Sequence, residues 1–102
     1  MKLEQQLYHL GFASQQAKLY IAGLKLGRSL MAHLAAEAKV KRGTAYYIIN
    51  ELIRRKFFFV KKIGKRTYYE AVAPEKIVTM TEERLRFVKK IYPQLKIIQK
   101  HN

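Results

Sequence analysis

The sequence predicts a mainly α (α+β) fold in which four helices are followed by a β-hairpin and one long helix. Up to residue 56, apolar residues recur at the three- and four-residue spacing of amphipathic helices. Between residues 57 and 72 the spacing shortens to two, which is the period of a half-buried strand. From Pro74 onward a broad apolar stripe returns at the helical period. This order, α-α-α-α-β-β-α, is typical of a winged helix-turn-helix with a long C-terminal helix.

The first three predicted helices are separated by glycine and serine signals. The first helix is predicted from the spacing of three leucines and closes at Gly11. Ser14 is expected to cap the second helix and Gly27 to end it, and Ser29 is expected to cap the third. The expected inner face of the second helix is Ala17, Tyr20, Ile21 and Leu24. That of the third is Leu30, Leu34, Ala35 and Ala38.

The hairpin and the last helix complete the predicted fold. Residues 57–62 and 67–72 are predicted strands, joined by a turn at residues 63–66. In the second strand, the expected inward residues are Tyr69 and Ala71, and the outward ones are Tyr68 and Glu70. Pro74 suits the first position of the last helix. Pro93 is expected to kink that helix or divide it in two.

The most informative stretch is residues 39–66, because its charge is so unevenly distributed. It holds ten of the 21 Lys and Arg residues against a single acid, Glu51, so it contributes +9 to the formal net charge of +14. The charges surround the fourth predicted helix, whose expected inner face is Ala45, Ile48, Ile49 and Leu52, and whose exposed end is expected to carry Arg54, Arg55 and Lys56. A basic helix before a basic hairpin is how a winged helix-turn-helix meets nucleic acid.

Size and composition limit the remaining possibilities. The 102 residues suffice for one small domain, which we divide into a DNA-binding winged helix-turn-helix at residues 1–73 and a C-terminal helix at residues 74–102. The net charge favours DNA, RNA or an anionic membrane as partner. The absence of cysteine excludes disulfides and thiolate metal sites. Because no signal peptide or membrane span is apparent, the expected location is cytoplasmic, without membrane attachment.

Four groups of residues carry a resemblance to a known family. They are Leu10-Gly11-Phe12 with Ala17-Lys18-Leu19-Tyr20; Leu24-Lys25-Leu26-Gly27; Val40, Arg42, Ala45-Tyr46, Ile49 and Leu52; and Tyr69, Ala71-Val72 and Pro74-Glu75. Their order and spacing resemble the winged-helix domain of the TrmB family of transcriptional regulators, over roughly residues 10–78. The related MarR-like winged helices share this order of elements.

This resemblance implies a DNA-binding regulator whose helix after the wing often pairs with that of a second copy. Two residues depart from the family pattern, since Lys41 stands where the family often has Pro and Lys56 where it often has Gly. Longer members also carry a sugar-binding C-terminal domain that these residues do not include. Sugar sensing is therefore not transferred, and a small-molecule effector stays unknown.

The outward side of the fourth helix, about residues 42–56, is the predicted recognition surface for the major groove. The residues expected to read bases are Arg42, Gly43, Thr44, Tyr47 and Asn50. An arginine can pair with guanine or a phosphate, asparagine can read adenine, and a glycine lets the backbone approach DNA. The residues expected at phosphates or in the wing are Arg28, Ser29, Lys41, Arg54, Lys61, Lys62, Lys65 and Arg66. The wing, residues 61–66, is assigned to the minor groove or its phosphates, and free N–H groups at residues 29–31 to a further phosphate.

Plainer interpretations apply to several conspicuous residues. Tyr46 borders the inner face, so packing is favoured over base readout. Residues 57–59, three phenylalanines, are most simply core plus one exposed ring rather than a stacking platform for single strands. His9, His33 and His101 are too widely separated to suggest a metal site. No arrangement of nucleophile, base and acid suggests an enzyme, and no cofactor is expected.

The last helix predicts self-association. Leu85, Val88, Tyr92 and Leu95 follow the 3-4-3 spacing of a helix–helix seam. We therefore expect a homodimer that presents two recognition helices about one DNA turn apart. The alternative is a monomer whose last helix folds back on its own first helices. Binding of this helix to anionic lipid, through Lys89, Lys90, Lys96 and Lys100, is a secondary alternative.

The leading hypothesis is a sequence-specific, double-stranded DNA-binding transcriptional regulator that acts as a homodimer. A non-specific nucleic-acid-binding protein, either chromatin-like or RNA-binding, is the second hypothesis, and the large charge favours it. A protein-interaction winged helix is the third. The operator, the regulated genes, the choice between activation and repression, and whether the chain belongs to a longer protein are not encoded in any visible pattern.

Overall fold

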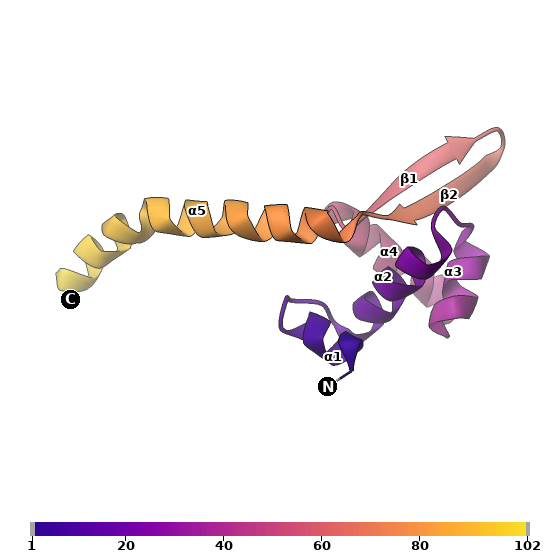
Figure 1. Cartoon of the computed structure of the whole chain (residues 1–102), viewed down its shortest axis with the longest axis horizontal. Coiled ribbons are helices and arrows are strands. Elements are labelled where there is room, and N and C mark those ends of the chain that lie inside the picture. Colours follow the sequence, from indigo (N-terminus) through magenta and orange to yellow (C-terminus); the bar gives the residue numbers. More distant parts are fainter. Residues whose placement is uncertain (1, 102) are drawn as a thin grey trace. The chain divides into compact units, whose positions relative to one another are not determined.

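The computed structural model describes residues 2–101, which form five helices and one two-stranded sheet. In chain order these are α1 (Leu3–Tyr8), α2 (Ser14–Leu26), α3 (Met31–Ala38), α4 (Arg42–Arg54), β1 (Phe58–Ile63), β2 (Arg66–Ala71) and α5 (Pro74–Lys100). The order confirms the α-α-α-α-β-β-α prediction (Figure 1). The chain separates into two compact units, one ending at Val72 and one beginning at Ala73 that holds α5.

The core of the first unit lies around α2, which packs against α1, α3, α4 and the hairpin. The predicted inner face of α4 is confirmed, since Ala45, Ile48, Ile49 and Leu52 are all buried. The predicted face of α2 is partly wrong. Leu24 is 41% exposed, whereas Leu19 and Gly23 are buried. A helix surrounded by neighbours buries more than one side, so a single apolar stripe does not describe it.

Two predicted serine caps are also wrong. The N-cap of α2 is Ala13, whose N–H donates to Oε1 of Gln16 at 3.0 Å, and Ser14 is the first helical residue. The N-cap of α3 is Leu30 rather than Ser29. The first helix holds only one buried residue, Leu7. The other two leucines of that predicted stripe, Leu3 and Leu10, are 56% and 49% exposed.

An aromatic cluster joins α2 to the base of the hairpin. The rings of Phe12 and Phe57 lie 4.6 Å apart between centroids, and Tyr20 packs edge-on against Phe58 at 6.4 Å. The Tyr20 hydroxyl donates to the carbonyl of Val72 at 2.9 Å. A Cβ added at Gly23 would lie 2.5 Å from Cζ of Phe58, so only glycine permits this close approach. These contacts fix the hairpin on the helices.

Arg55 was expected at an exposed helix end, but the structure places it against the core. Its guanidinium carbon lies 5.4 Å from the ring centroid of Phe12 and 5.1 Å from that of Phe57. It donates hydrogen bonds to the carbonyl of Gly11 at 3.0 Å and to Oε1 of Gln16 at 2.9 Å. Because these groups come from the loop after α1 and from α2, Arg55 ties the end of α4 to distant segments.

The hairpin is an antiparallel pair whose register runs from Phe58 opposite Ala71 to Ile63 opposite Arg66. Gly64 opens its two-residue turn with a φ of 61°, the positive value that a type II′ turn requires at that position. Tyr69 shares the core-facing side with Ala71, as predicted. Tyr68 and Glu70 lie on the other side and are half-buried.

The second unit consists of α5, which begins at Pro74 after the N-cap Ala73. It remains one helix through Pro93, and Figure 1 shows it bending in its C-terminal part. The helix is therefore not divided at Pro93. None of its described residues is buried. Across residues 2–101, no helix combines the length and apolar character that crossing a membrane requires.

Candidate nucleic-acid interface

The exposed side of α4 brings together the residues predicted to read bases. Arg42, Gly43, Thr44, Tyr47 and Asn50 are all exposed, and Tyr47 is 65% exposed despite its aromatic ring. A Cβ added at Gly43 would meet nothing within 4 Å, so no internal packing demands glycine there. Because Gly43 has no side chain, a ligand can approach the backbone of the first turn of α4 closely. Among these five residues there is no acid.

A tight turn between α3 and α4 presents this surface. Lys39 ends α3 in the left-handed conformation, with φ of 57°, and its N–H donates to the carbonyl of Ala36. Val40 is buried and its N–H donates to the carbonyl of Ala35 at 3.0 Å. Lys41 is the extended N-cap of α4 and its side chain is exposed. The pair α3–α4 thus forms a helix-turn-helix with Lys41 at the start of the second helix.

Tyr46 links α4 to the hairpin. Its ring packs edge-on against Tyr69 of β2, with centroids 6.4 Å apart and an interplanar angle of 84°. On its other side, the guanidinium carbon of Arg42 lies 6.0 Å from the Tyr46 ring centroid. Burial, and next the nearby Tyr46, raise the pKa of the Tyr69 phenol above its ordinary value. These contacts support a packing role for Tyr46.

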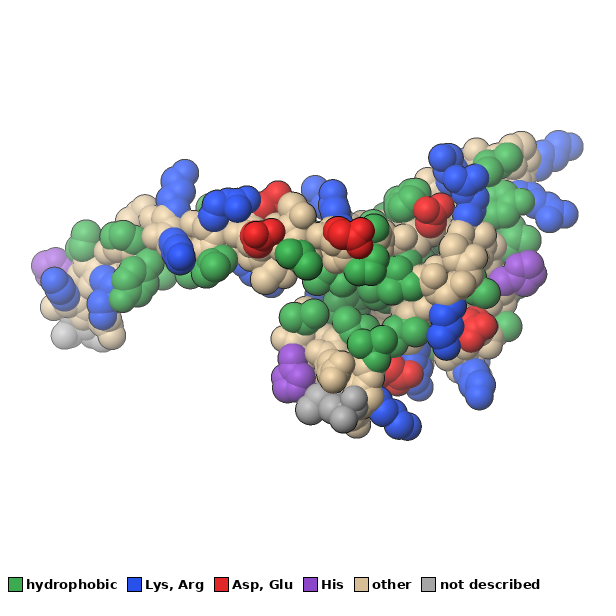
Figure 2. Space-filling model, viewed as in Figure 1, with side chains coloured by type: hydrophobic (Ala, Val, Ile, Leu, Met, Phe, Trp, Pro, Cys, Tyr) green, Lys and Arg blue, Asp and Glu red, His purple; other side chains and the backbone are tan. Residues whose placement is uncertain are grey.

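The hairpin presents four exposed cations, and Figure 2 shows basic side chains at its tip. They are Lys61, Lys62, Lys65 and Arg66. Lys61 lies opposite Tyr68 and Lys62 opposite Thr67, so these neighbouring lysines point to opposite faces of the sheet. Lys62 shares its face with Tyr69, the residue that contacts α4. The wing cations are therefore divided between the two faces of the hairpin. The sequence interpretation had treated them as one group.

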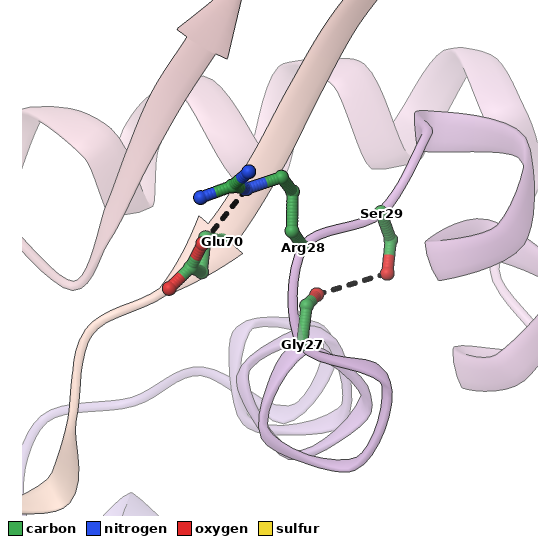
Figure 3. A network of polar contacts seen from close by, with 4 residues as sticks. All are labelled: Gly27, Arg28, Ser29 and Glu70. Carbon is green, nitrogen blue, oxygen red and sulfur yellow. Dashed lines mark hydrogen bonds and ion pairs between the residues drawn. The ribbon is translucent and has the colours of Figure 1, made fainter.

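Arg28 and Ser29 lie beside β2 rather than at a free helix end. The N–H of Ser29 donates to the carbonyl of Tyr69 at 3.0 Å, and its hydroxyl donates to the carbonyl of Gly27 at 2.9 Å. Ser29 is only 6% exposed. Nε of Arg28 donates to Oε1 of Glu70 at 3.4 Å (Figure 3). The expected free N–H at Ser29 is therefore wrong, because this segment pairs with the hairpin edge.

A groove beside α4 includes residues that the sequence interpretation did not select. It is lined by Ala13, Ser14, Gln15 and Gln16 from the start of α2 and by Thr44, Tyr47, Ile48 and Glu51 from α4. Ser14 and Gln15 are exposed and carry hydrogen-bonding side chains next to the predicted reading surface. The run of polar residues at the start of α2 was a visible signal, but it was interpreted as helix capping alone.

A helix-turn-helix with an exposed, cationic second helix, followed by a basic hairpin, defines the winged helix-turn-helix class of protein. Comparison with family models agrees, because the model described as "Sugar-specific transcriptional regulator TrmB" matches residues 7–75. The chain belongs to the TrmB family. It is therefore a member of a family of transcriptional regulators and not of enzymes.

Solved structures share this fold. TrmBL2, an archaeal chromatin protein, is 18% identical with a TM-score of 0.76, and the match covers 96% of this chain and 38% of that one. A MarR family transcriptional regulator from Silicibacter pomeroyi DSS is 12% identical with a TM-score of 0.62, covering 97% of this chain and 62% of that one. Sso10a-2, a DNA-binding protein from Sulfolobus solfataricus, is 15% identical with a TM-score of 0.51, covering 86% and 94%.

The present chain spans less than two thirds of the first two of these proteins, and at such identities the likeness establishes the fold alone. No curated protein sequence matches the chain.

Proposed function

We propose that this protein is a sequence-specific, double-stranded DNA-binding transcriptional regulator that acts as a homodimer. In this proposal α4 enters the major groove, and the hairpin lies on the neighbouring minor groove or its phosphates. Occupation of a promoter would regulate transcription sterically, by blocking or repositioning polymerase. The observation that carries the proposal is the outward side of α4, where five exposed polar, aromatic or glycine residues lie opposite a buried apolar face. Glu51, the one acid of this helix, lines the groove beside Thr44 and Tyr47.

The chemistry of that side suits base readout. Arg42 has donors for guanine or a phosphate, and Asn50 has the donor–acceptor pair that adenine requires. Thr44 and Tyr47 offer a hydroxyl and apolar surface for a phosphate or a thymine methyl. Gly43 adds no side chain that would hold the backbone away. Arg54, Lys41 and the wing cations, all exposed, would then hold phosphates and set the register.

The proposed dimer rests on α5. The four seam residues, Leu85, Val88, Tyr92 and Leu95, are between 47% and 56% exposed. Their 3-4-3 spacing places them along one side of the helix, which suits pairing with the same helix of a second copy. Two copies would present two α4 helices to a pseudo-palindromic site.

A second candidate function is non-specific binding of nucleic acid. The formal net charge of +14 on 102 residues is the observation that favours it, since phosphate contacts alone supply most non-specific affinity. TrmBL2 is described as a chromatin protein and Sso10a-2 as a DNA-binding protein, which makes this candidate worth testing directly.

Selection of bound duplexes from a random pool separates the two candidates. If regulation is the function, a consensus should emerge, and affinity for it should exceed affinity for random duplex by roughly 10³ at physiological salt. Both affinities should be measured at several salt concentrations, because non-specific binding weakens steeply with salt. Equal affinity for all duplexes would overturn the first proposal and support the second. Negligible binding to any duplex or RNA would overturn both.

A further inference from the structure

The basic residues of α5 are not used by the proposed winged-helix interface. From Arg84 to Lys100 this helix has six Lys or Arg residues and no acid: Arg84, Arg86, Lys89, Lys90, Lys96 and Lys100. All six side chains are exposed. Figure 2 shows basic and hydrophobic side chains together along the length of the helix. α5 therefore carries positive charge of its own, in addition to that of α4 and the hairpin.

Three of these cations form a cluster within one turn. Lys89 and Lys90 follow Arg86 by three and four residues, which places their Cβ atoms roughly 5–6 Å from that of Arg86 on one side of the helix. Glu82 and Glu83 precede Arg86 by about one turn. Among the described residues, however, the two ion pairs are Lys25–Glu37 and Arg28–Glu70, and neither lies in α5. Like charges at this spacing destabilise an isolated helix unless an anion neutralises them.

Two of the three cations, Arg86 and Lys90, lie on a different side of α5 from the apolar seam. Lys89 follows Leu85 by four residues and therefore borders the seam. Arg86 and Lys90 fall between seam positions Leu85, Val88 and Tyr92, so the helical period turns them away from that stripe. Covering the seam with a second copy would leave Arg86 and Lys90 open to solvent, with Lys89 at the edge of the interface. A helix that lies on lipid must instead insert its apolar side into the bilayer, and pairing of the seam opposes that arrangement.

We infer that Arg86, Lys89 and Lys90 form a second phosphate-binding surface for nucleic acid, separate from α4 and the wing. Double-stranded DNA carries about one negative charge per 1.7 Å of its axis, so it supplies anions densely enough to face three cations within one helical turn. Its long cationic side chains suit phosphates of any sequence, so the surface contacts the backbone without sequence preference. It adds affinity to any nucleic acid that the protein binds, and does not depend on sequence-specific recognition by α4.

The test compares two triple variants of the full chain. One variant, Arg86→Gln/Lys89→Gln/Lys90→Gln, removes the cluster while keeping good helix formers. The control, Lys2→Gln/Lys18→Gln/Lys25→Gln, removes the same charge from the N-cap of α1 and from α2, outside every proposed contact. Within the described residues, the ion pair that it removes is the exposed one between Lys25 and Glu37, at 3.9 Å. Both are titrated with a random-sequence duplex of about 40 base pairs, roughly four helical turns, over a range of salt concentrations. Circular dichroism and light scattering confirm that helix content and mass equal those of the parent.

We expect the cluster variant to lower the slope of log affinity against log salt by about 0.9 for each phosphate that it no longer neutralises, up to about three phosphates. The control should leave the slope unchanged. Equal effects of the two variants, or no effect of the cluster variant, would overturn the inference. Vesicles of phosphatidylcholine and phosphatidylglycerol provide the other arm: loss of vesicle binding with an unchanged DNA slope would assign the cluster to lipid. If neither the parent nor either variant prefers a consensus duplex, the proposed function is rejected. The inference about the cluster does not depend on that result.

Discussion

Lys56 adopts a left-handed backbone conformation, with φ of 66°, directly after α4. Its side chain is exposed, and its N–H donates to the carbonyl of Ile53 at 3.0 Å. This turn redirects the chain so that Phe57 enters the core. It is also the position at which the TrmB pattern often has glycine, which adopts positive φ without steric penalty. The departure from the family pattern thus has an identifiable conformational cost.

Replacing Lys56 with glycine should therefore stabilise the protein. Relief of the left-handed strain contributes roughly 1–2 kcal/mol, and the greater flexibility of glycine in the unfolded chain offsets about 0.5–1 kcal/mol. The expected gain in the free energy of unfolding is about 0.5–1 kcal/mol, measured by urea titration. Lys61→Gly is the control, since it removes the same charge within strand β1 and should lower stability. A loss of stability in both variants would contradict the argument.

Individual long-range partners were the part of the site that sequence patterns did not predict. Arg55 was expected at the exposed end of the fourth helix, but its acceptors belong to Gly11 and Gln16, 44 and 39 residues away. Ser29 was expected to cap a helix, yet its backbone pairs with Tyr69. A local pattern contains no information about which distant backbone will meet a serine or an arginine. Charge and polarity alone leave both roles open.

At the scale of elements, the recognition helix α4 was predicted more accurately than the central helix α2. One side of α4 faces the core and the other faces solvent, so its apolar period identifies both sides. The hairpin was predicted to within about one residue, because its turn glycine and its alternation agree. α2 lies between several elements. Which residues of α2 are buried depends on the elements around it and not on one apolar stripe. Leu24, which belongs to the predicted stripe, is exposed.

The division of work between α4 and the hairpin is itself testable. Alanine at Thr44 or Asn50 should change the preference among selected sites, because these exposed side chains are proposed to meet bases. Alanine at Lys62 and Lys65 should weaken binding to all duplexes equally and reduce the log–log salt slope by about one unit for each phosphate left without its cation. Competition binding against single-base variants of the consensus measures the first effect, and affinities at several salt concentrations measure the second. Similar behaviour of all four substitutions would show that readout and anchoring are not divided in this way.

At the scale of the whole molecule, α5 presents more apolar surface than an isolated helix would keep exposed in water. None of its described residues is buried, although residues such as Leu85, Tyr92 and Ile98 are large and apolar. Exposed apolar stripes of this kind mark interaction surfaces. The seam was predictable from spacing alone, since heptad-like patterns are local. Its partner is a property of assembly, and only a measurement of mass identifies it.

The dimer proposal predicts a solution mass of twice the 12.0 kDa of the chain at tens of micromolar, measured by light scattering after size exclusion. Two substitutions test whether the seam is responsible. Leu95→Gln changes a seam residue that is 53% exposed, and Ile97→Gln changes a neighbour that is 57% exposed but lies two residues away, off the seam.

Burying two copies of a half-exposed leucine contributes roughly 2–3 kcal/mol to association. Leu95→Gln should therefore raise the dissociation constant of the dimer about 30- to 150-fold, whereas Ile97→Gln should leave it near that of the parent. Equal effects would place the interface elsewhere on α5. A parent mass of 12.0 kDa would contradict the dimer itself, and α4 would then have to recognise a single half-site.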